Sequence, residues 1–242
     1  MEAIKTVNLR KQYKNLIAVD NLNLEIIKGE LFSLLGVNGA GKTTTIKMLS
    51  CLSKPTSGDA FVGGYSITSN IDNIKGIIGV SPQEIAVAPN LSVWENLEFI
   101  CGIHGFTKEH TKTKIKTLAH QFSLRNCLNQ KAGTLSGGYQ RRLSIAMALI
   151  GDPEILFLDE PTLGLDVIAR SELWDILRSL KGHITIVLTT HYMEEAETLS
   201  DRIGIMKGGK LLVVGTAVEL MNQTNTTKFE NAFVSVVKGA EK

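Results

Sequence analysis

Short apolar runs of strand length alternate along the chain with stretches of helical periodicity. Runs that are almost wholly apolar are expected to be strands buried on both faces of a sheet; they lie at residues 31–35, 155–158 and 184–188. Other strand-like runs lie at residues 4–9, 60–62 and 77–80, and on either side of a turn at 207–209. Leu22, Leu24 and Ile26 alternate with polar residues, which predicts another strand with one buried face.

Helical segments are predicted at residues 42–52, 92–122, 138–150 and 167–180. In the second of these, Leu97, Ile100 and Cys101 fall on one face of a helix. Strands that alternate with helices predict an α/β fold, and the long helical block interrupts that alternation. We therefore expect one domain over residues 1–222, with a helical subdomain at about residues 86–150 inserted in the α/β core. The polar residues 223–242 are expected to form a loosely held tail.

The composition is that of an ordinary globular chain. Apolar residues make up 43% and charged residues 21% of the 242 positions, enough to build a sizeable core. The first 19 residues hold no apolar stretch of signal-peptide length. No apolar run approaches the ~20 residues that a membrane span requires. We expect a soluble protein, so any role at a membrane must come through a partner.

Charge and cysteine content exclude two further classes of function. The chain has 26 basic and 24 acidic residues, so it has no broad basic field, and no nucleic-acid partner is expected. The four lysines within residues 108–116 are typical of the solvated face of a helix. Three scattered cysteines lack metal-ligand spacing and suit a reducing compartment.

The most informative motif is Gly36-Val37-Asn38-Gly39-Ala40-Gly41-Lys42-Thr43, between a predicted buried strand and a predicted helix. It has the glycines, lysine and threonine of a phosphate-binding loop. Glycines let the backbone close on an anion, and successive N–H groups and the helix N-terminus then face the phosphates. Lys42 is expected to hold the outer phosphates and Thr43 to bind Mg²⁺. A Gly-rich turn arising by chance would not account for the strand and helix on either side.

A second motif is the run at residues 155–158, which ends in Asp159 and Glu160. A buried strand delivers such carboxylates to the carboxyl edge of the sheet, where ligands bind in α/β folds. Asp159 is expected to hold Mg²⁺, and Glu160 to orient or deprotonate the attacking water. An acidic pair after a strand is more often a helix cap, but the phosphate-binding loop favours catalysis here.

A third motif, Leu135-Ser136-Gly137-Gly138-Tyr139-Gln140, opens a helix with a hydroxyl and two glycines, and so predicts a second anion-binding helix start. One ATP molecule rarely needs two helix N-termini from distant segments. We therefore expect two chains to face each other, each completing the site of the other.

Together these motifs resemble the ATPase subunits of ABC transporters, over about residues 2–220. The resemblance implies an α/β fold: a P-loop NTPase core with a mixed sheet, an N-terminal antiparallel β-subdomain and an inserted helical subdomain. It implies an ATPase that uses ATP and Mg²⁺, dimerises with an identical or related ATPase subunit, and drives a separate integral membrane permease. Such subunits are cytoplasmic and peripheral on the inner face of the cell membrane.

The resemblance also implies roles for single residues. The catalytic residues implied are Glu160 and His191, and the Mg²⁺ ligands are Thr43, Gln83 and Asp159. Leu165 and Asp166 match the loop that crosses the dimer interface. The implied nucleotide contacts are Tyr13, which would stack on adenine, and Gly36, Val37, Asn38, Gly39, Ala40, Gly41, Lys42, Thr43 and Thr44. The implied contacts to the nucleotide of the facing chain are Ser136, Gly137, Gly138 and Gln140.

Two positions depart from the common family pattern. Tyr139 stands where many members have Gln, and Leu163-Gly164 replaces the commoner Ser-Ala or Ser-Gly pair. The segments at residues 190–197, 215–220 and 229–233 look like the exporter-type branch, which is similar to ABC-2 or to drug and sodium efflux systems. The same segments are also compatible with an acidic solvated helix start and a packed C-terminal segment.

Two other classes of protein share part of this pattern. A soluble ABC-type ATPase that acts as an assembly or regulatory factor would carry the same motifs. A nucleotide kinase or GTPase would share the phosphate-binding loop, but it would not account for residues 135–140. The remaining histidines match no motif and are expected to be structural or exposed; they are His104, His110, His120 and His183.

Overall fold

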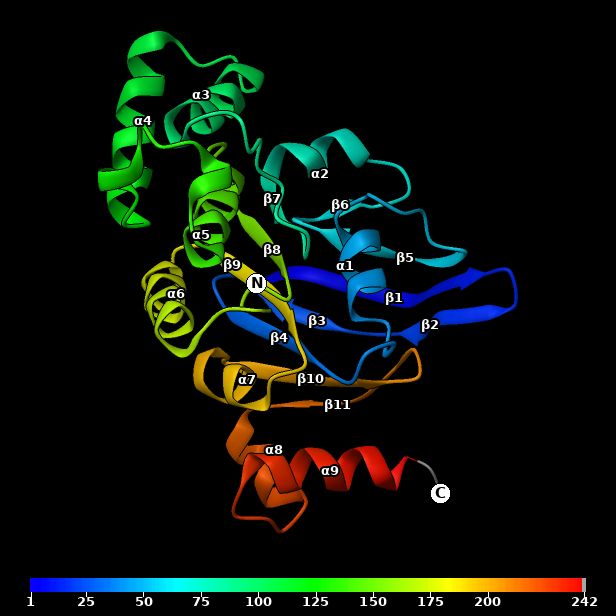
Figure 1. Cartoon of the computed structure of the whole chain (residues 1–242). Coiled ribbons are helices and arrows are strands. Elements are labelled where there is room, and N and C mark those ends of the chain that lie inside the picture. Colours follow the sequence, from blue (N-terminus) through cyan, green and yellow to red (C-terminus); the bar gives the residue numbers. More distant parts are fainter. Residues whose placement is uncertain (241–242) are drawn as a thin grey trace.

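The computed structural model describes residues 1–240 (Figure 1). It consists of two β-sheets with helices packed against them, an outlying group of helices and a C-terminal helix pair. The larger sheet has six strands in the order β11-β10-β4-β9-β8-β7. All neighbours in it are parallel except β10 and β11. Its strands are β4 (Leu31–Leu35), β7 (Ile78–Ser81), β8 (Ile155–Asp159), β9 (Thr185–Thr190), β10 (Arg202–Lys207) and β11 (Lys210–Gly215).

The three central strands β4, β8 and β9 are buried at every residue, as their apolar sequences predict. Leu35 at the end of β4 pairs with Thr190 at the end of β9, and Asp159 at the end of β8 pairs with Thr189. The carboxyl ends of three strands therefore meet at one edge, and the loops that follow them converge there.

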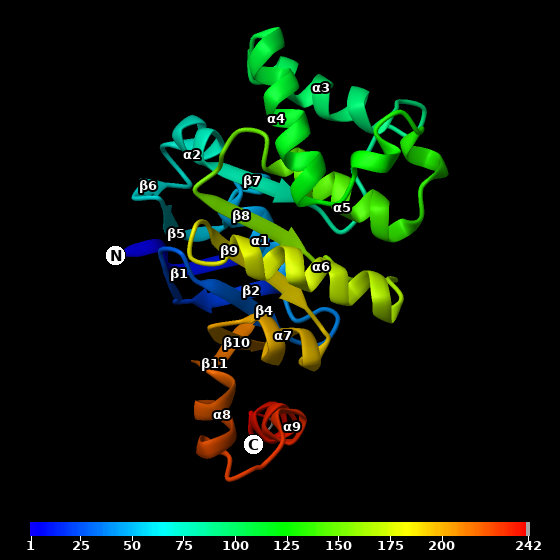
Figure 2. The ribbon, with the colours of Figure 1, turned by 90° about the vertical axis from the view of Figure 1, so that its left-hand side faces the viewer.

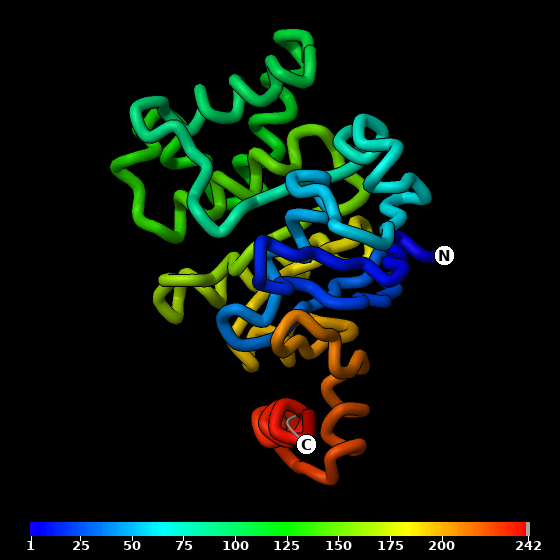
Figure 3. The backbone as a smooth tube through the Cα atoms, turned by 90° about the vertical axis from the view of Figure 1, so that its right-hand side faces the viewer, coloured from blue at the N-terminus to red at the C-terminus, as the bar shows by residue number. Residues whose placement is uncertain are grey.

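The smaller sheet has five strands and is antiparallel throughout. Its strands are β1 (Glu2–Tyr13), β2 (Leu16–Leu22), β3 (Glu25–Ile27), β5 (Ser57–Val62) and β6 (Tyr65–Ser66). It forms the N-terminal β-subdomain, whose first two strands lie beside the larger sheet in Figure 3. The antiparallel subdomain inferred from sequence is thereby confirmed.

The prediction of a single strand through Leu22, Leu24 and Ile26 is wrong, because the strand is interrupted between the end of β2 and the start of β3. The cause is Thr6, whose Oγ1 donates to Leu22 O at 2.9 Å and accepts from Leu24 N at 2.8 Å. One side chain thus replaces a rung of the ladder. All three apolar residues remain buried, as the alternation requires.

The helical subdomain is inserted between β7 and β8 and stands apart from the sheets at the top of Figure 1. Its helices are α3 (Val93–Ile103), α4 (Lys108–Gln121) and α5 (Gly137–Ala148), with short 3₁₀ turns at Arg125–Cys127 and Ala132–Thr134. The long block predicted at residues 92–122 is two helices, because Gly105 between them adopts a φ of +69°. Ser92 begins the first with a capping box to Glu95.

The remaining helices of the core pack against the larger sheet. They are α1 (Lys42–Leu49), α2 (Ile71–Ile77), α6 (Val167–Leu180) and α7 (Met193–Leu199). Alternate residues of the central strands enter different cores: Leu156 and Leu158 face α6 and the helical subdomain, whereas Ile155 and Phe157 face α1 and the β-subdomain. None of the helices within residues 1–240 has the length and apolar character needed to cross a bilayer.

The C-terminal residues form α8 (Ala217–Gln223) and α9 (Phe229–Gly239), which lie side by side at the bottom of Figures 1 and 3. Phe229 and Phe233 are buried in one cluster with Leu35 and Ala196 of the core. Up to residue 240 the chain is therefore packed, whereas the polar sequence after residue 222 predicts a loosely held tail; residues 241–242 lie outside the described residues.

Candidate functional site

A cavity of about 610 Å³ opens at the edge where the three central strands end. The β-subdomain lines its outer part with Tyr13, Leu16, Ile17 and Ala18. Its inner part is polar and comprises the loop after β4, the start of α1, Gln83, Glu160 and His191. An apolar outer wall over a polar floor suits a ligand with a flat ring at one end and charged groups at the other.

The loop from Gly36 to Gly41 needs glycine at two crowded positions. A Cβ on Gly36 would lie 2.4 Å from Met206 O, and one on Gly41 would lie 2.4 Å from Ala18 O. Gly41 also has a φ of +103°, which side chains rarely adopt. From Asn38 to Thr44 every residue lines the cavity, whereas Gly36 and Val37 do not. This backbone is shaped for close approach by an anion.

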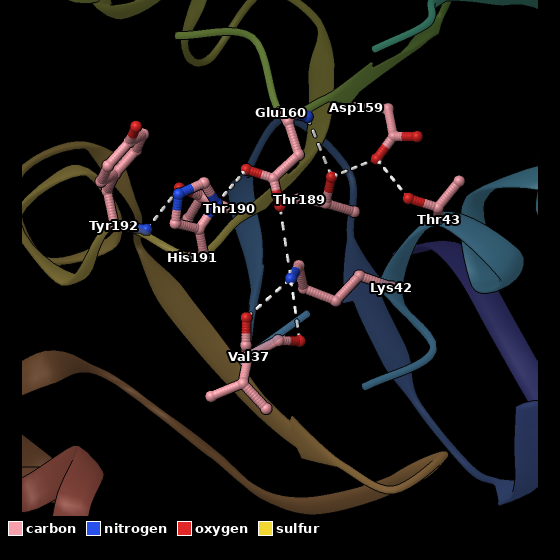
Figure 4. Close-up of polar contacts among 10 residues, drawn as sticks. Val37, Lys42, Thr43, Asp159, Glu160, Thr189, Thr190, His191 and Tyr192 are labelled. Atoms are coloured by element: carbon pink, nitrogen blue, oxygen red, sulfur yellow. Dashed lines mark hydrogen bonds and ion pairs between the residues drawn. The ribbon is translucent and has the colours of Figure 1, made fainter. Parts of the chain in front are cut away.

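Lys42 is the cation at the floor of the cavity (Figure 4). Its Nζ donates to Gly36 O at 2.6 Å and to Val37 O at 3.3 Å, and lies 3.3 Å from Glu160 Oε1. Its side chain is only 5% exposed. A buried ammonium held by backbone carbonyls has little rotational freedom, so it offers a fixed positive charge to phosphate oxygens.

Asp159 is held behind the cavity by two hydroxyl groups. Thr43 Oγ1 donates to Asp159 Oδ1 at 3.0 Å, and Thr189 Oγ1 donates to the same oxygen at 2.5 Å. The three residues come from α1, β8 and β9 (Figure 4). Both hydroxyl groups donate to Oδ1, so the position of the carboxyl group is fixed from two sides.

Glu160 points to the opposite side and pairs with His191. His191 Nδ1 lies 2.6 Å from Glu160 Oε2 (Figure 4). The backbone N–H of Glu160 donates to both the carbonyl and the hydroxyl of Thr189, at 3.1 and 3.0 Å. The Glu160 carboxylate thus lies between the Lys42 ammonium and the His191 imidazole, in the wall of the cavity that the Gly-rich loop lines. A carboxylate there is placed to orient or deprotonate a water molecule.

The oxygen groups near Asp159 fit Mg²⁺. This cation prefers oxygen ligands and keeps several waters, so it needs few protein groups besides phosphate. Thr43 supplies a hydroxyl and Asp159 a carboxylate within one hydrogen-bonded cluster, and Gln83 lines the same cavity with an amide. Arg141 supports Gln83, since its Nη1 and Nη2 donate to Pro82 O and Gln83 O at 2.7 and 2.6 Å.

The second segment that the sequence predicts to bind an anion lies outside this cavity. Ser136 caps the start of α5, yet its side chain makes no capping hydrogen bond. Ser136 and Gly137 are exposed and Gly138 is buried, where a Cβ would lie 2.9 Å from Ala169 Cβ. Gln140 is turned inward, with Nε2 donating to Ala132 O and Leu135 O. The open helix end at Ser136 therefore faces solvent within one chain.

The loop before α6 is partly exposed. Asp166 caps α6 by accepting from Ala169 N at 2.9 Å, and Leu165 packs against the core of the helical subdomain. Tyr13 is 44% exposed at the mouth of the cavity, with Lys11 Nζ 4.9 Å from its ring centroid. Of the nucleotide contacts inferred from sequence, the structure brings together Tyr13 and the loop.

Comparison with known proteins decides the family. The family model described as "ABC transporter" matches residues 19–163, which is more than half of the chain. The chain belongs to the ABC transporter family. It is 45% identical over 226 residues to ABC transporter A family member 11 of Arabidopsis thaliana, covering 93% of this chain and 23% of that protein. It is 42% identical over 221 residues to the phospholipid-transporting ATPase ABCA3 of Homo sapiens, covering 90% and 13%.

The chain thus spans less than a quarter of the length of these two relatives. A dimeric ATP-binding cassette solved in a post-hydrolysis state with ADP and Pi is 29% identical, with a TM-score of 0.79 over 88% of this chain and 98% of the other. An ATP-binding subunit of an ABC transporter, 24% identical, shares the fold with a TM-score of 0.86 over 97% and 99%. The predicted fold class is confirmed, and this chain is an ABC cassette.

Two residues of the cassette's site escape sequence analysis. Thr189 joins Asp159 to the backbone of Glu160, and Arg141 holds the segment that carries Gln83. Neither stands in a contiguous motif with the groups that it supports. For Arg141 one signal exists: it follows Gln140 directly, at the start of the helix predicted at residues 138–150.

Proposed function

We propose that this chain binds Mg-ATP in the cavity and hydrolyses it, as one of two ATPase subunits that drive a membrane-spanning exporter. The observation that carries the proposal is Glu160, whose buried carboxylate lies between Lys42 and His191 next to the Asp159–Thr43 pair. A base, a fixed cation and a metal-binding cluster together are the parts that phosphoryl transfer to water requires.

Each group has one task in this scheme. The adenine stacks on Tyr13, and the loop N–H groups with Lys42 hold the phosphates. Thr43, Asp159 and Gln83 hold Mg²⁺, which when bound neutralises charge on the phosphate oxygens. Glu160 accepts a proton from the attacking water, and His191 fixes the orientation of its carboxylate. Lys42 must exchange its contact with Glu160 for the phosphates as ATP enters.

A second ATPase subunit completes the site. The exposed, uncapped start of α5 at Ser136 carries a partial positive charge and free N–H groups, which suit the phosphates of a facing chain. Leu165 and Asp166 lie just before α6, whose Ala169 is next to Gly138 at the start of α5. The dimeric solved cassette supports this arrangement.

The proposal of a membrane partner rests on the relatives, and that of export rests on the exporter-like segments at residues 190–197, 215–220 and 229–233. The chain is similar to members of the A family of ABC transporters, one of which is described as phospholipid-transporting. We place the chain at the cytoplasmic face of a membrane, where the loop from Gln83 to Trp94 passes the motion of the helical subdomain to a permease. A phospholipid is the first cargo to test.

Glu160→Gln tests the catalytic role. The amide keeps the shape of the side chain but cannot take a proton, so we expect ATP binding to persist while steady phosphate release falls by about 10²-fold or more. Light scattering with Mg-ATP should show that the variant is dimeric. Phosphate release close to that of wild type removes Glu160 from catalysis, and a monomer at saturating ATP means that dimerisation needs the permease.

The partner is tested by purification from gently solubilised membranes of the native cell, using a C-terminal tag and mass spectrometry. A multi-span protein in near-stoichiometric amount supports the transporter. If the tagged chain is absent from membranes and recovers soluble partners alone, the ATPase assignment stands and the chain acts instead as an assembly or regulatory factor.

A further inference from the structure

A buried carboxyl group lies behind the Glu160–His191 pair. Glu195, in the first turn of α7, is 0% exposed. Trp174 Nε1 on α6 donates to its Oε1 at 3.2 Å. Within residues 1–240, Oε2 has no hydrogen-bond partner of good geometry, and Glu195 has no ion pair. A carboxylate in such surroundings would be costly, because buried charges need a paired charge or several donors.

Three segments that lead into the site meet at this carboxyl group. Thr162 lies in the loop between Glu160 and the start of α6, Thr190 ends β9 next to His191, and Trp174 lies on α6. The hydroxyl groups of Thr162 and Thr190 and the indole of Trp174 all adjoin the carboxyl group. Helices α6 and α7 lie next to each other on one face of the larger sheet (Figure 2).

The charges around Glu195 favour its neutral form. Burial raises the pKa of Glu195 and outweighs the hydrogen bonds from Thr190, Thr162 and Trp174, which lower it; the negative charge of Glu160 adds a smaller rise. The nearby cation on α6, Arg170, pairs with Glu194 at 3.2 Å and lies 5.2 Å from the Trp174 ring centroid. His191 is engaged by Glu160. Glu195 Oε2 and Thr162 Oγ1 are both buried without a hydrogen-bond partner in the described chain, and a neutral carboxyl group adds an O–H donor to this pair.

We propose that Glu195 is a positioning residue, whose neutral carboxyl group ties together the loop after Glu160, the strand end before His191 and helix α6. The proposal rests on the ATP hydrolysis proposed above, because Glu160 and His191 belong to two of the segments that it joins. Without this tie the two segments can shift relative to each other while the phosphate-binding loop stays in place. Small displacements of catalytic groups lower turnover strongly and leave ground-state binding largely intact.

Steady-state kinetics of three variants test the tie. Glu195→Ala removes the carboxyl group, and we expect kcat to fall about tenfold or more while KM for ATP changes little. Glu195→Gln has the shape and donor capacity of the neutral acid, so it should retain kcat within about twofold. The control, Glu194→Gln, alters the exposed neighbour that pairs with Arg170 and should also stay within about twofold. Normal kcat in Glu195→Ala, or equal loss in the Gln variant, overturns the proposal.

The pH dependence of stability tests the neutral form without any activity. If the folded-state pKa of Glu195 is raised, folded chains hold one more proton than unfolded chains between the ordinary and the raised pKa. The contribution of Glu195 to wild-type stability should then be full below the ordinary carboxyl range and fall as pH rises through that window. Glu195→Gln should lack this fall when both proteins are unfolded by urea at several pH values.

Identical pH dependence in wild type and Glu195→Gln means that the carboxyl group is ionised, and the proposal fails. This measurement also decides the matter if Glu195→Ala does not fold. If wild type releases no phosphate, the proposed function fails, while the comparison of urea unfolding still tests Glu195.

Discussion

At the scale of single residues, adjacent carboxylates take different partners because of one backbone angle. Glu160 has a φ of +49°, a left-handed backbone conformation that residues other than Gly and Asn seldom adopt. Its N–H is held by both oxygens of Thr189, which offsets the strain. The turn sends Asp159 to the hydroxyl of Thr43 and Glu160 to His191. In the proposed reaction, one sequence pair thus serves both the metal site and the proton acceptor.

Thr189→Val tests this division at constant side-chain shape. Valine removes the hydroxyl that donates to Asp159 and accepts from Glu160, and we expect kcat to fall about tenfold. Stability should fall by about 1–3 kcal/mol, because a buried oxygen loses its donor. Thr189→Ser keeps the hydroxyl and is the matched control. Equal kcat and equal urea midpoints in the two variants would show that the hydroxyl supports neither carboxylate.

Sequence reasoning finds site residues that stand in contiguous motifs and misses those that act across the fold. Lys42, Asp159 and Glu160 were predictable because strand, loop and helix surround them in order. Thr189 and Glu195 owe their roles to neighbours from other segments, and their burial cannot be inferred from a polar residue type. A threonine at the end of an apolar strand looks the same whether it faces a carboxylate or a backbone group.

At the scale of elements, the connection between β7 and α3 is held at both ends. Arg141, 3% exposed on α5, grips the carbonyls of Pro82 and Gln83. Asn96, 1% exposed on α3, bonds the backbone of Ala88 and Ser92. Gln83 thus joins the cavity to the helical subdomain through a segment with two fixed ends.

Arg141→Lys releases one of these ends. Lysine cannot reproduce the forked guanidinium that donates to two adjacent carbonyls, so Gln83 should become mobile. We expect the Mg²⁺ concentration for half-maximal ATPase activity to rise about tenfold. The exposed Arg178→Lys is the control and should leave it unchanged. An unchanged Mg²⁺ dependence in Arg141→Lys would show that Gln83 does not contribute to metal binding.

The elements themselves were largely predictable, and the exceptions have physical causes. Buried strands and the hairpin at residues 207–209 follow from periodicity and glycine alone. The break between β2 and β3 does not, because it depends on Thr6 from another strand. Helix α9 was missed because the sequence around it is mostly polar. Its apolar residues indicate a packed helix only once the surface that they pack against is known.

At the scale of the whole molecule, the C-terminal helices connect to the catalytic edge. Phe229 of α9 is 1% exposed and shares a cluster with Leu35, which precedes the phosphate-binding loop, and Ala196, which lies on the helix after His191. Residues far apart in sequence thus support the two segments on either side of the cavity. The domain boundary predicted at residue 222 stays a prediction, and the packing of α9 argues that the core extends beyond it.

Phe229→Ala measures how much of the molecule depends on this packing. Removing a buried phenylalanine leaves a cavity, and we expect a loss of about 3–5 kcal/mol in the free energy of unfolding by urea. Val234→Ala, on the exposed side of the same helix at 39% exposure, should change it by less than about 0.5 kcal/mol. Because Leu35 and Ala196 belong to the cluster that loses this side chain, ATPase activity should decline at lower temperature in Phe229→Ala than in the control. Equal stability of the two variants would mean that α9 unfolds independently of the core, as expected of a loosely held tail.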